Sequence, residues 1–301
     1  MSWLTHLIGV PGGTLTVHER PAHTTPGRGE PVPLVLLHGF TGNGQSWTRV
    51  AEALPASRIL APDLPGHGST RFADEPRACT FASAIDTLTQ ALDHLQVNRC
   101  HLAGYSMGGR LALFHALERR DRVARLILES ASPGLATEAE RAARRDSDAA
   151  LARFAVGRGI EEFTARWETT PVLAAEHRLP PHTRDELRAQ RLRCRAEGLA
   201  ASLLGMGAGA QPWLGERLGE VGVPVLLIAG GADEKFRSIG GEMRALLCDA
   251  RLEIVPGAGH NVHLEQPDAF AALITAFAYP GLAAGATPAA APQRKNERID
   301  A

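Results

Sequence analysis

Short runs of hydrophobic residues alternate along the chain with longer segments whose apolar residues recur at helical spacing. The run Leu34–Leu37 is continuously apolar, which is typical of a strand buried on both faces of a parallel sheet. Thr14–His18 instead alternates between apolar and polar residues, as expected of an edge strand. Further short runs predict strands at Arg58–Pro62, Arg99–Ala103, Arg125–Glu129, Val223–Ala229 and Arg251–Val255.

Helical spacing fills most of the intervals between these runs. In Thr80–Leu95, five apolar residues fall on one helical face. Strands that alternate with helices predict an α/β fold with a doubly wound, mostly parallel sheet. The other helices expected between the strands are Ser46–Leu54, a helix directly after Ser106, Ser238–Cys248 and Pro267–Phe277.

The pattern changes between Leu135 and Pro212, where strand-like runs are absent and Ala, Arg, Glu and Leu dominate. We interpret this stretch as a helical cap inserted into the sheet. The predicted division is a core of residues 1–133 and 213–279, a cap of residues 134–212, and a disordered tail of residues 280–301. The expected cap helices are Thr137–Val156, Ile160–Trp167, Thr183–Ala196 and Leu199–Met206.

Composition narrows the functional classes. A formal net charge of −1 gives no indication of a nucleic-acid partner. The four cysteines are scattered, so neither a zinc site nor a disulfide framework is indicated. No signal peptide and no apolar run long enough to span a membrane is visible, and we expect a cytoplasmic protein without membrane insertion. The number of subunits stays open between a monomer and a small homo-oligomer.

The most informative motif is Gly104-Tyr105-Ser106-Met107-Gly108, which reads G-x-S-x-G between a predicted strand and a predicted helix. This arrangement predicts a nucleophile elbow, in which a sharp turn exposes the Ser106 hydroxyl at the helix N-terminus. Small residues on either side let the strained turn close. Taken alone, the motif is also compatible with a serine that simply caps a helix.

A nucleophilic serine needs a base and an acid that orients the base, and both follow later strands. Asp233 follows the strand ending at Ala229, and His260 follows the strand ending at Val255. In open α/β sheets, ligand sites lie at the carboxyl ends of the strands, where these residues fall. We therefore predict a triad of Ser106, His260 and Asp233. Glu129 is the rival acid, and the rival histidines are His38, His67 and His263.

Two further features of the predicted site concern charge. The backbone N–H groups of Phe40 and Met107 are the expected oxyanion hole. Arg110 lies one helical turn after Ser106, so its guanidinium can point toward the pocket. It would then bind an anionic substrate, whereas the alternative is a salt bridge to a loop carboxylate or a solvated side chain.

Several segments together resemble a known family. They include His38–Gly42, Asp63–Gly68, Gly104–Arg110, Asp233–Arg237 and Ala258–His263. The fold and elbow are similar to the α/β-hydrolase superfamily, and the whole set resembles the 2-succinyl-6-hydroxy-2,4-cyclohexadiene-1-carboxylate synthases of menaquinone biosynthesis. The resemblance covers about Pro33 to Phe277. The chain departs from the family at Ala208-Gly209-Ala210 and in its long C-terminal tail.

This resemblance implies a carbon–oxygen lyase that eliminates pyruvate from 2-succinyl-5-enolpyruvyl-6-hydroxy-3-cyclohexene-1-carboxylate, without metal or organic cofactor. The partner would be this small tricarboxylate, with carboxylates bound by Arg110, Arg144 and Arg193. Tyr105 and Trp167 would line the pocket. The alternatives are a serine hydrolase of esters or carbon–carbon bonds, and a binding protein that keeps the fold without catalysis.

Overall fold

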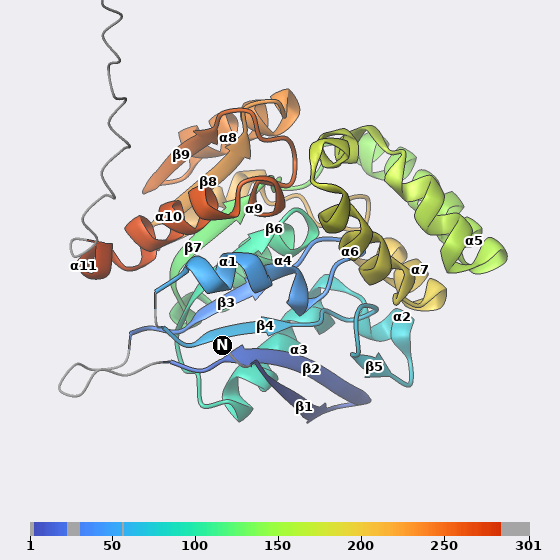
Figure 1. The fold of residues 1–301 in the computed structure, drawn as a ribbon, viewed down its shortest axis with the longest axis horizontal. Helices are drawn as coiled ribbons and strands as arrows, with labels where there is room; N and C mark the ends of the chain where they lie inside the picture. Colours follow the sequence, from blue (N-terminus) through green and yellow to red (C-terminus); the bar gives the residue numbers. More distant parts are fainter. Residues whose placement is uncertain (1–2, 23–30, 56, 284–301) are drawn as a thin grey trace, which may run out of the picture.

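The computed structural model describes residues 3–22, 31–55 and 57–283, and its main feature is a twisted sheet of nine strands (Figure 1). The strand order is β1-β2-β4-β3-β6-β7-β8-β9, with β5 beside β2. From β4 to β9 every neighbouring pair is parallel, whereas β2 is antiparallel to β1, β4 and β5. The strands are β1 Leu4–Val10, β2 Gly13–Arg20, β3 Leu34–Leu37, β4 Ile59–Pro62, β5 Arg71–Phe72, β6 Cys100–Tyr105, β7 Val123–Glu129, β8 Val225–Gly230 and β9 Ala250–Val255.

Helices cover both faces of this sheet, which confirms the predicted fold class. Helices α3, α4 and α8 pack on one face, and α1 and α10 pack on the other. A strand between two helical layers must be apolar on both sides, and this explains the continuous hydrophobic runs. The helices of the core are α1 Thr48–Ala53, α2 Glu75–Ala78, α3 Phe81–His94, α4 Met107–Glu118, α8 Glu234–Leu246, α9 Val262–Glu265, α10 Pro267–Ala278 and α11 Pro280–Ala283.

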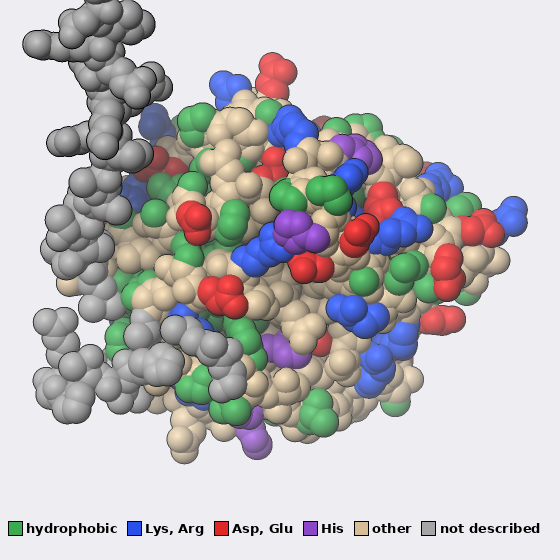
Figure 2. Space-filling model, in the orientation of Figure 1, with side chains coloured by type: hydrophobic (Ala, Val, Ile, Leu, Met, Phe, Trp, Pro, Cys, Tyr) green, Lys and Arg blue, Asp and Glu red, His purple; other side chains and the backbone are tan. Residues whose placement is uncertain are grey.

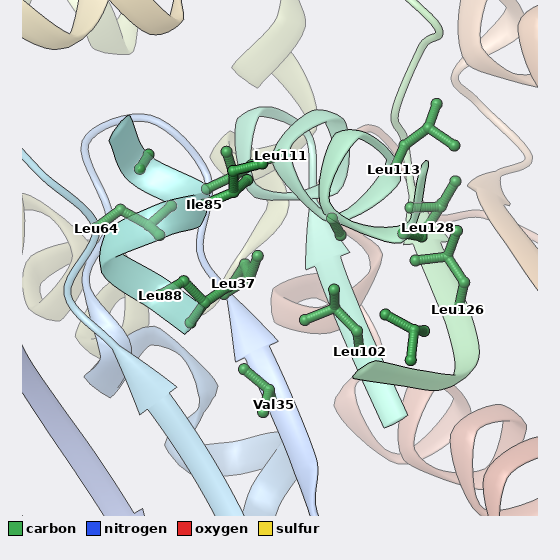
Figure 3. Packing of buried hydrophobic residues seen from close by; sticks show 14 of the residues in the cluster. Val35, Leu37, Leu64, Ile85, Leu88, Leu102, Leu111, Leu113, Leu126 and Leu128 are labelled. Carbon is green, nitrogen blue, oxygen red and sulfur yellow. The ribbon is translucent and has the colours of Figure 1, made fainter. Parts of the chain in front are cut away.

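Side chains of successive strand residues alternate between the two layers. Val35 and Leu37 of β3 belong to the cluster under α3 and α4, whereas Leu34 and Leu36 belong to the cluster under α1 and α10. Figure 3 shows the first cluster, in which leucines of β3, β6 and β7 meet side chains of α3 and α4. This packing fixes the strand ends from which the loops of the site project.

Two predictions about the core and one about the start of the tail are corrected. The predicted edge strand at Thr14–His18 lies inside the sheet, because β1 pairs along its outer side. Helix α8 begins at Glu234 rather than Ser238, because the Asp233 side chain accepts a hydrogen bond from the N–H of Phe236 and caps the helix there. The first residues of the predicted tail form α11, and residues 284–301 lie outside the described part of the chain.

The predicted cap stretch contains no strand between β7 and β8. It consists of α5 Glu138–Glu168, the 3₁₀ helix η3 Pro171–Arg178, α6 Pro181–Leu192 and α7 Ala196–Met206, grouped at one end of the sheet (Figure 1). Helix α5 is broken at Gly159, where the backbone leaves helical geometry, so it comprises the two helices expected there. The boundaries of the cap at residues 134 and 212 stay a prediction.

The cap and the core meet backbone against backbone where α7 crosses the loop after β4. A Cβ atom on Gly66, in the loop after β4, would lie 2.4 Å from the carbonyl oxygen of Gly198 in α7. A Cβ atom on Gly198 would lie equally close to the carbonyl oxygen of Gly66. Because real Cβ atoms do not approach a carbonyl oxygen so closely, both positions require glycine, and α7 rests directly on the core.

The surface is mixed in charge. Basic and acidic side chains are both spread over the face seen in Figure 2, in line with 32 basic and 33 acidic residues in the sequence. Among the described helices, none combines the length and the apolar character that a membrane span would need.

Candidate active site

Ser106 lies at a strained turn between β6 and α4. Its backbone has φ of 50° and ψ of −107°, a conformation that non-glycine residues rarely adopt. The glycines of the motif make the turn possible. A Cβ atom on Gly104 would lie 2.3 Å from the carbonyl oxygen of Gly108, and one on Gly108 would lie 2.3 Å from that of Leu37. The turn therefore has the geometry of a nucleophile elbow.

The structure brings Ser106, His260 and Asp233 together from three loops. Nδ1 of His260 lies 2.7 Å from Oδ2 of Asp233, and Nε2 lies 3.2 Å from Oγ of Ser106. A proton on Nδ1 is held by the carboxylate, which leaves Nε2 free to accept the hydroxyl proton of the serine. The second carboxylate oxygen of Asp233 accepts the N–H of Phe236, which fixes the carboxylate at the start of α8.

The rival acid Glu129 has other partners. Its carboxylate is fully buried and accepts hydrogen bonds from the backbone N–H and the Nδ1 atom of His263, at 2.9 and 2.8 Å. Glu129 and His263 thus form a buried pair that ties the end of β7 to α9. Glu129 contacts Ser106 only through the backbone, where its carbonyl accepts the N–H of Ser106 at 2.8 Å. Among the described residues, the side chains of Glu129 and His263 form no hydrogen bond with the side chain of Ser106 or His260.

The other two rival histidines shape the loops. The Nε2 atom of His38 accepts the backbone N–H of Leu64, so its proton resides on Nδ1, which donates to the carbonyl of Gly39. The ring of His67 meets that of His38 edge to face at 5.0 Å. Burial lowers the pKa of His38 to about 4 and that of His67 to about 3, so both rings are neutral near pH 7.

The two predicted oxyanion donors flank the serine. Phe40 and Met107 both line the cavity that contains Ser106, and no hydrogen bond within the described ranges engages their backbone N–H groups. Met107 is the first residue of α4, where N–H groups point outward without helical partners. The ring of Phe40 packs edge to face against Phe163 and Trp167 of the cap.

Ser106 opens into a cavity of about 290 Å³ between the core and the cap. Tyr105 and Trp167 line this cavity as predicted, and the ring of Tyr105 lies 5.4 Å from that of His260. Burial, with the nearby Glu176 and Glu129 carboxylates, keeps the pKa of Tyr105 well above its usual value, so its phenol stays protonated. The charged side chains in the lining are Arg110, Arg144, Glu176, Arg191 and Lys235.

Arg110 is a cation of this cavity whose hydrogen-bond partner is not acidic. Its Nη1 atom donates to the amide oxygen of Gln211 at 3.2 Å, and its guanidinium carbon lies 5.7 Å from the ring centre of Phe81. No described carboxylate forms a salt bridge with it. Burial, together with the cation of Arg144, lowers its pKa to about 10, so it still carries its charge at pH 7. Such a half-buried cation is suited to bind an anion.

The predicted cap arginines divide into two groups. Arg144 lines the cavity and donates from Nε to the buried Asp148 at 2.8 Å. Arg193 does not line it, and this prediction is corrected: Arg193 ends α6 with an exposed side chain. Arg191 lies in the cavity wall instead, paired with Glu176 at 2.7 Å. The helical face shared by Thr183, Leu187 and Arg191 was the available signal in the sequence.

Comparisons with known proteins agree with this geometry. The model of the alpha/beta hydrolase family matches residues 34–273. A protein of Bacillus subtilis (strain 168), provisionally named 2-succinyl-6-hydroxy-2,4-cyclohexadiene-1-carboxylate synthase, is 45% identical over 81% of this chain and 89% of its own. The synthase of that name from Citrobacter koseri is 35% identical over 78% of this chain and 88% of its own.

A solved structure gives the same result. MenH from S. aureus superimposes with a TM-score of 0.81 at 33% identity, covering 87% of this chain and 97% of that chain. The chain belongs to the 2-succinyl-6-hydroxy-2,4-cyclohexadiene-1-carboxylate synthase family, within the alpha/beta hydrolase family. It is therefore an enzyme, and the family resemblance seen in the sequence is confirmed.

Across residues 3–22, 31–55 and 57–283, no three His, Cys, Asp or Glu side chains are grouped as a metal ion would require. The polar groups that face the cavity are instead hydroxyls, amides and the charged side chains named above.

Proposed function

We propose that this enzyme eliminates pyruvate from 2-succinyl-5-enolpyruvyl-6-hydroxy-3-cyclohexene-1-carboxylate in menaquinone biosynthesis. The ring proton at C2 is acidic, because the succinyl carbonyl is adjacent and the ring double bond follows. Removal of that proton places the electron pair between C2 and C3, the old double bond moves to C4 and C5, and the C5–O bond breaks. The products are the 2,4-cyclohexadiene and enolpyruvate, which becomes pyruvate by tautomerisation.

Ser106 acts as the base in this proposal. Its hydroxyl proton passes to Nε2 of His260 over the 3.2 Å contact, and the alkoxide takes the proton from C2. Asp233 holds the imidazole in the required tautomer and stabilises the imidazolium that forms. His260 then donates its proton to the leaving enolpyruvate.

The negative charge that develops on the succinyl carbonyl oxygen needs hydrogen-bond donors to stabilise it. The N–H groups of Phe40 and Met107 supply them, and the N-terminus of α4 adds its positive partial charge. Both N–H groups are free of other partners among the described residues, which supports their assignment as the oxyanion hole.

The observation that carries the proposal is that Arg110 has no acidic partner among the described residues. A cation in the cavity that bonds only to a neutral amide gains nothing from a neutral ester, but it gains a partner from a carboxylate. The substrate has three carboxylates. We assign one to Arg110 and one to Arg144, and we assign Arg191 the place that the sequence analysis gave to Arg193. Tyr105 and Trp167 form apolar walls for the ring.

Pyruvate release from freshly prepared substrate tests the reaction. We expect wild type to release pyruvate quickly and Ser106→Ala to be slower by about 10³-fold or more. Ser238→Ala is the matched control, because Ser238 is an exposed residue of α8 outside the cavity, and it should behave as wild type. A blank without enzyme is required, since the substrate decays spontaneously.

Two results would contradict the proposal. If wild type released no pyruvate above the blank, the enzyme would not be this lyase, and rapid turnover of neutral esters would identify a serine hydrolase instead. If Ser106→Ala released pyruvate at the wild-type rate, the lyase would stand but the role of the serine as base would not.

A further inference from the structure

Four cations line the cavity, and they differ in how far their charge is already satisfied. Arg144 is paired with Asp148, and Arg191 is paired with Glu176. Arg110 bonds to a neutral amide. Lys235 forms no ion pair with any described residue, and its ammonium contacts an aromatic ring instead. The cavity thus presents two cations without acidic partners, and only Arg110 is accounted for above.

Lys235 lies in the first turn of a helix, where a basic side chain is unfavourable for helix stability. Helix α8 is capped by Asp233, so Lys235 is its second residue. The first turn of a helix carries a positive partial charge and favours acidic side chains. A lysine here works against the stability of its own helix, and such local conflicts are expected where a residue serves a site.

The aromatic contact places the ammonium beside the catalytic histidine. Nζ of Lys235 lies 5.6 Å from the ring centre of Phe236, and that ring lies 4.6 Å from the ring of His260. All three residues line the cavity. Because Lys235 is exposed, its charge lies at the rim, where an entering anion meets it first. Cation–π contact restrains the ammonium without neutralising it.

We propose that Lys235 is a specificity residue that binds one carboxylate of the substrate at the rim of the cavity. It selects multiply charged substrates over neutral ones and speeds their entry, while Arg110 holds a second carboxylate deeper inside. This inference rests on the proposed function, since it assumes a substrate with several carboxylates.

Lys235→Gln tests the inference, with Arg237→Gln as its matched control. Arg237 is exposed on the same helix, does not line the cavity, and loses the same charge. For Lys235→Gln we expect KM to rise about 10-fold while kcat stays within about threefold of wild type. Lys235→Arg should recover most of the loss. The dependence of kcat/KM on salt concentration should be weaker in Lys235→Gln than in wild type.

Two results would overturn the inference: an unchanged KM in Lys235→Gln, or an equal rise in KM in Arg237→Gln. A second measurement is independent of turnover. Binding of the intact substrate to Ser106→Ala is followed by tryptophan fluorescence after rapid mixing, since Trp167 lines the cavity. Addition of Lys235→Gln to this variant should weaken binding about 10-fold.

The two assays separate the inference from the proposed function. If wild type released no pyruvate but Lys235→Gln still weakened binding, the reaction would be wrong and the carboxylate site would remain. If wild type released pyruvate and Lys235→Gln changed neither KM nor binding, the reaction would remain and the role of Lys235 would be wrong.

Discussion

Nη1 of Arg110 donates a hydrogen bond to Oε1 of Gln211 over 3.2 Å, so a half-buried guanidinium is held by a neutral amide. The amide fixes the orientation of the cation and leaves its charge available. The Nε2 atom of the same amide donates to the carbonyl of Ser132, which fixes the orientation of the amide in turn. The enzyme therefore stores an uncompensated positive charge one helical turn from Ser106.

Replacement of Arg110 by Met should separate stability from activity. Burial lowers the pKa of Arg110 to about 10, which means that the folded state disfavours its charge. Met keeps the apolar stem and removes that charge, so we expect the free energy of unfolding to rise by about 1 kcal/mol. We also expect kcat/KM for the anionic substrate to fall about 100-fold. Urea denaturation and pyruvate release measure the two effects, and wild-type activity would contradict the assignment.

The two strand-end carboxylates should respond differently to neutralisation. Asp233→Asn removes the acceptor that orients His260, and we expect pyruvate release to fall about 10³- to 10⁴-fold with little change in stability. Glu129→Gln disturbs the buried pair with His263 and should lower the free energy of unfolding by about 1–3 kcal/mol, with activity within a few-fold of wild type at low temperature. The reverse pattern would make Glu129 the acid of the site.

The cap should influence the oxyanion hole through one aromatic contact. The ring of Phe163 in α5 meets the ring of Phe40 edge to face at 6.2 Å, and the Phe40 N–H is a proposed oxyanion donor. Phe163→Leu removes that edge contact, so we expect kcat to fall about 10-fold with a smaller change in KM. Phe154→Leu, in the part of α5 before the break at Gly159, is the control, because the ring contacts of Phe40 with described residues are to His67, Phe163 and Trp167. Equal effects of the two variants would refute the coupling.

Acid should destabilise the fold before the carboxylates titrate. The folded pKa of His38 is about 4, below its ordinary value of 6.5, so between these pH values the unfolded chain binds a proton that the folded chain does not. The contribution of His38 to the free energy of unfolding is therefore fully present above about pH 6.5. It falls by about 3 kcal/mol as the pH is lowered toward 4. His67 adds to the loss.

Urea denaturation at pH 7 and pH 4.5 measures this loss. His182→Gln is the control, because His182 is exposed on α6 and should leave the difference between the two pH values unchanged. An equal free energy of unfolding at both pH values in wild type would contradict the neutral state of the two buried rings.

Much of the fold follows from local patterns in the sequence. Hydrophobic runs such as Leu34–Leu37 predict buried parallel strands because helices cover both faces of the sheet. Strand β1 was not predicted, because its apolar residues do not alternate with polar ones and only Ile8 is buried. Its presence moves β2 from the edge to the interior of the sheet.

The sequence predicts those residues of the site that lie on loops directly after strands. Ser106, Asp233 and His260 each follow a parallel strand, so the topology alone brings them to one edge of the sheet. No such rule applies to the cap. Which of its side chains face the cavity depends on how each cap helix is rotated and placed. That is why Arg193 was predicted there, whereas Arg191, two residues earlier on the buried face of α6, is the arginine in the wall.

The contact between Gly66 and Gly198 has a consequence for changing what the enzyme accepts. At that point the two backbones leave no space for even a methyl group, so α7 cannot be moved toward the core or reshaped by side-chain substitution there. Helix α5 has open space at Gly157, where a Cβ atom would meet no atom within 4 Å, and it already bends at Gly159. A laboratory search for variants that take bulkier substrates should therefore randomise the cavity-facing positions of α5 and leave the two glycines unchanged.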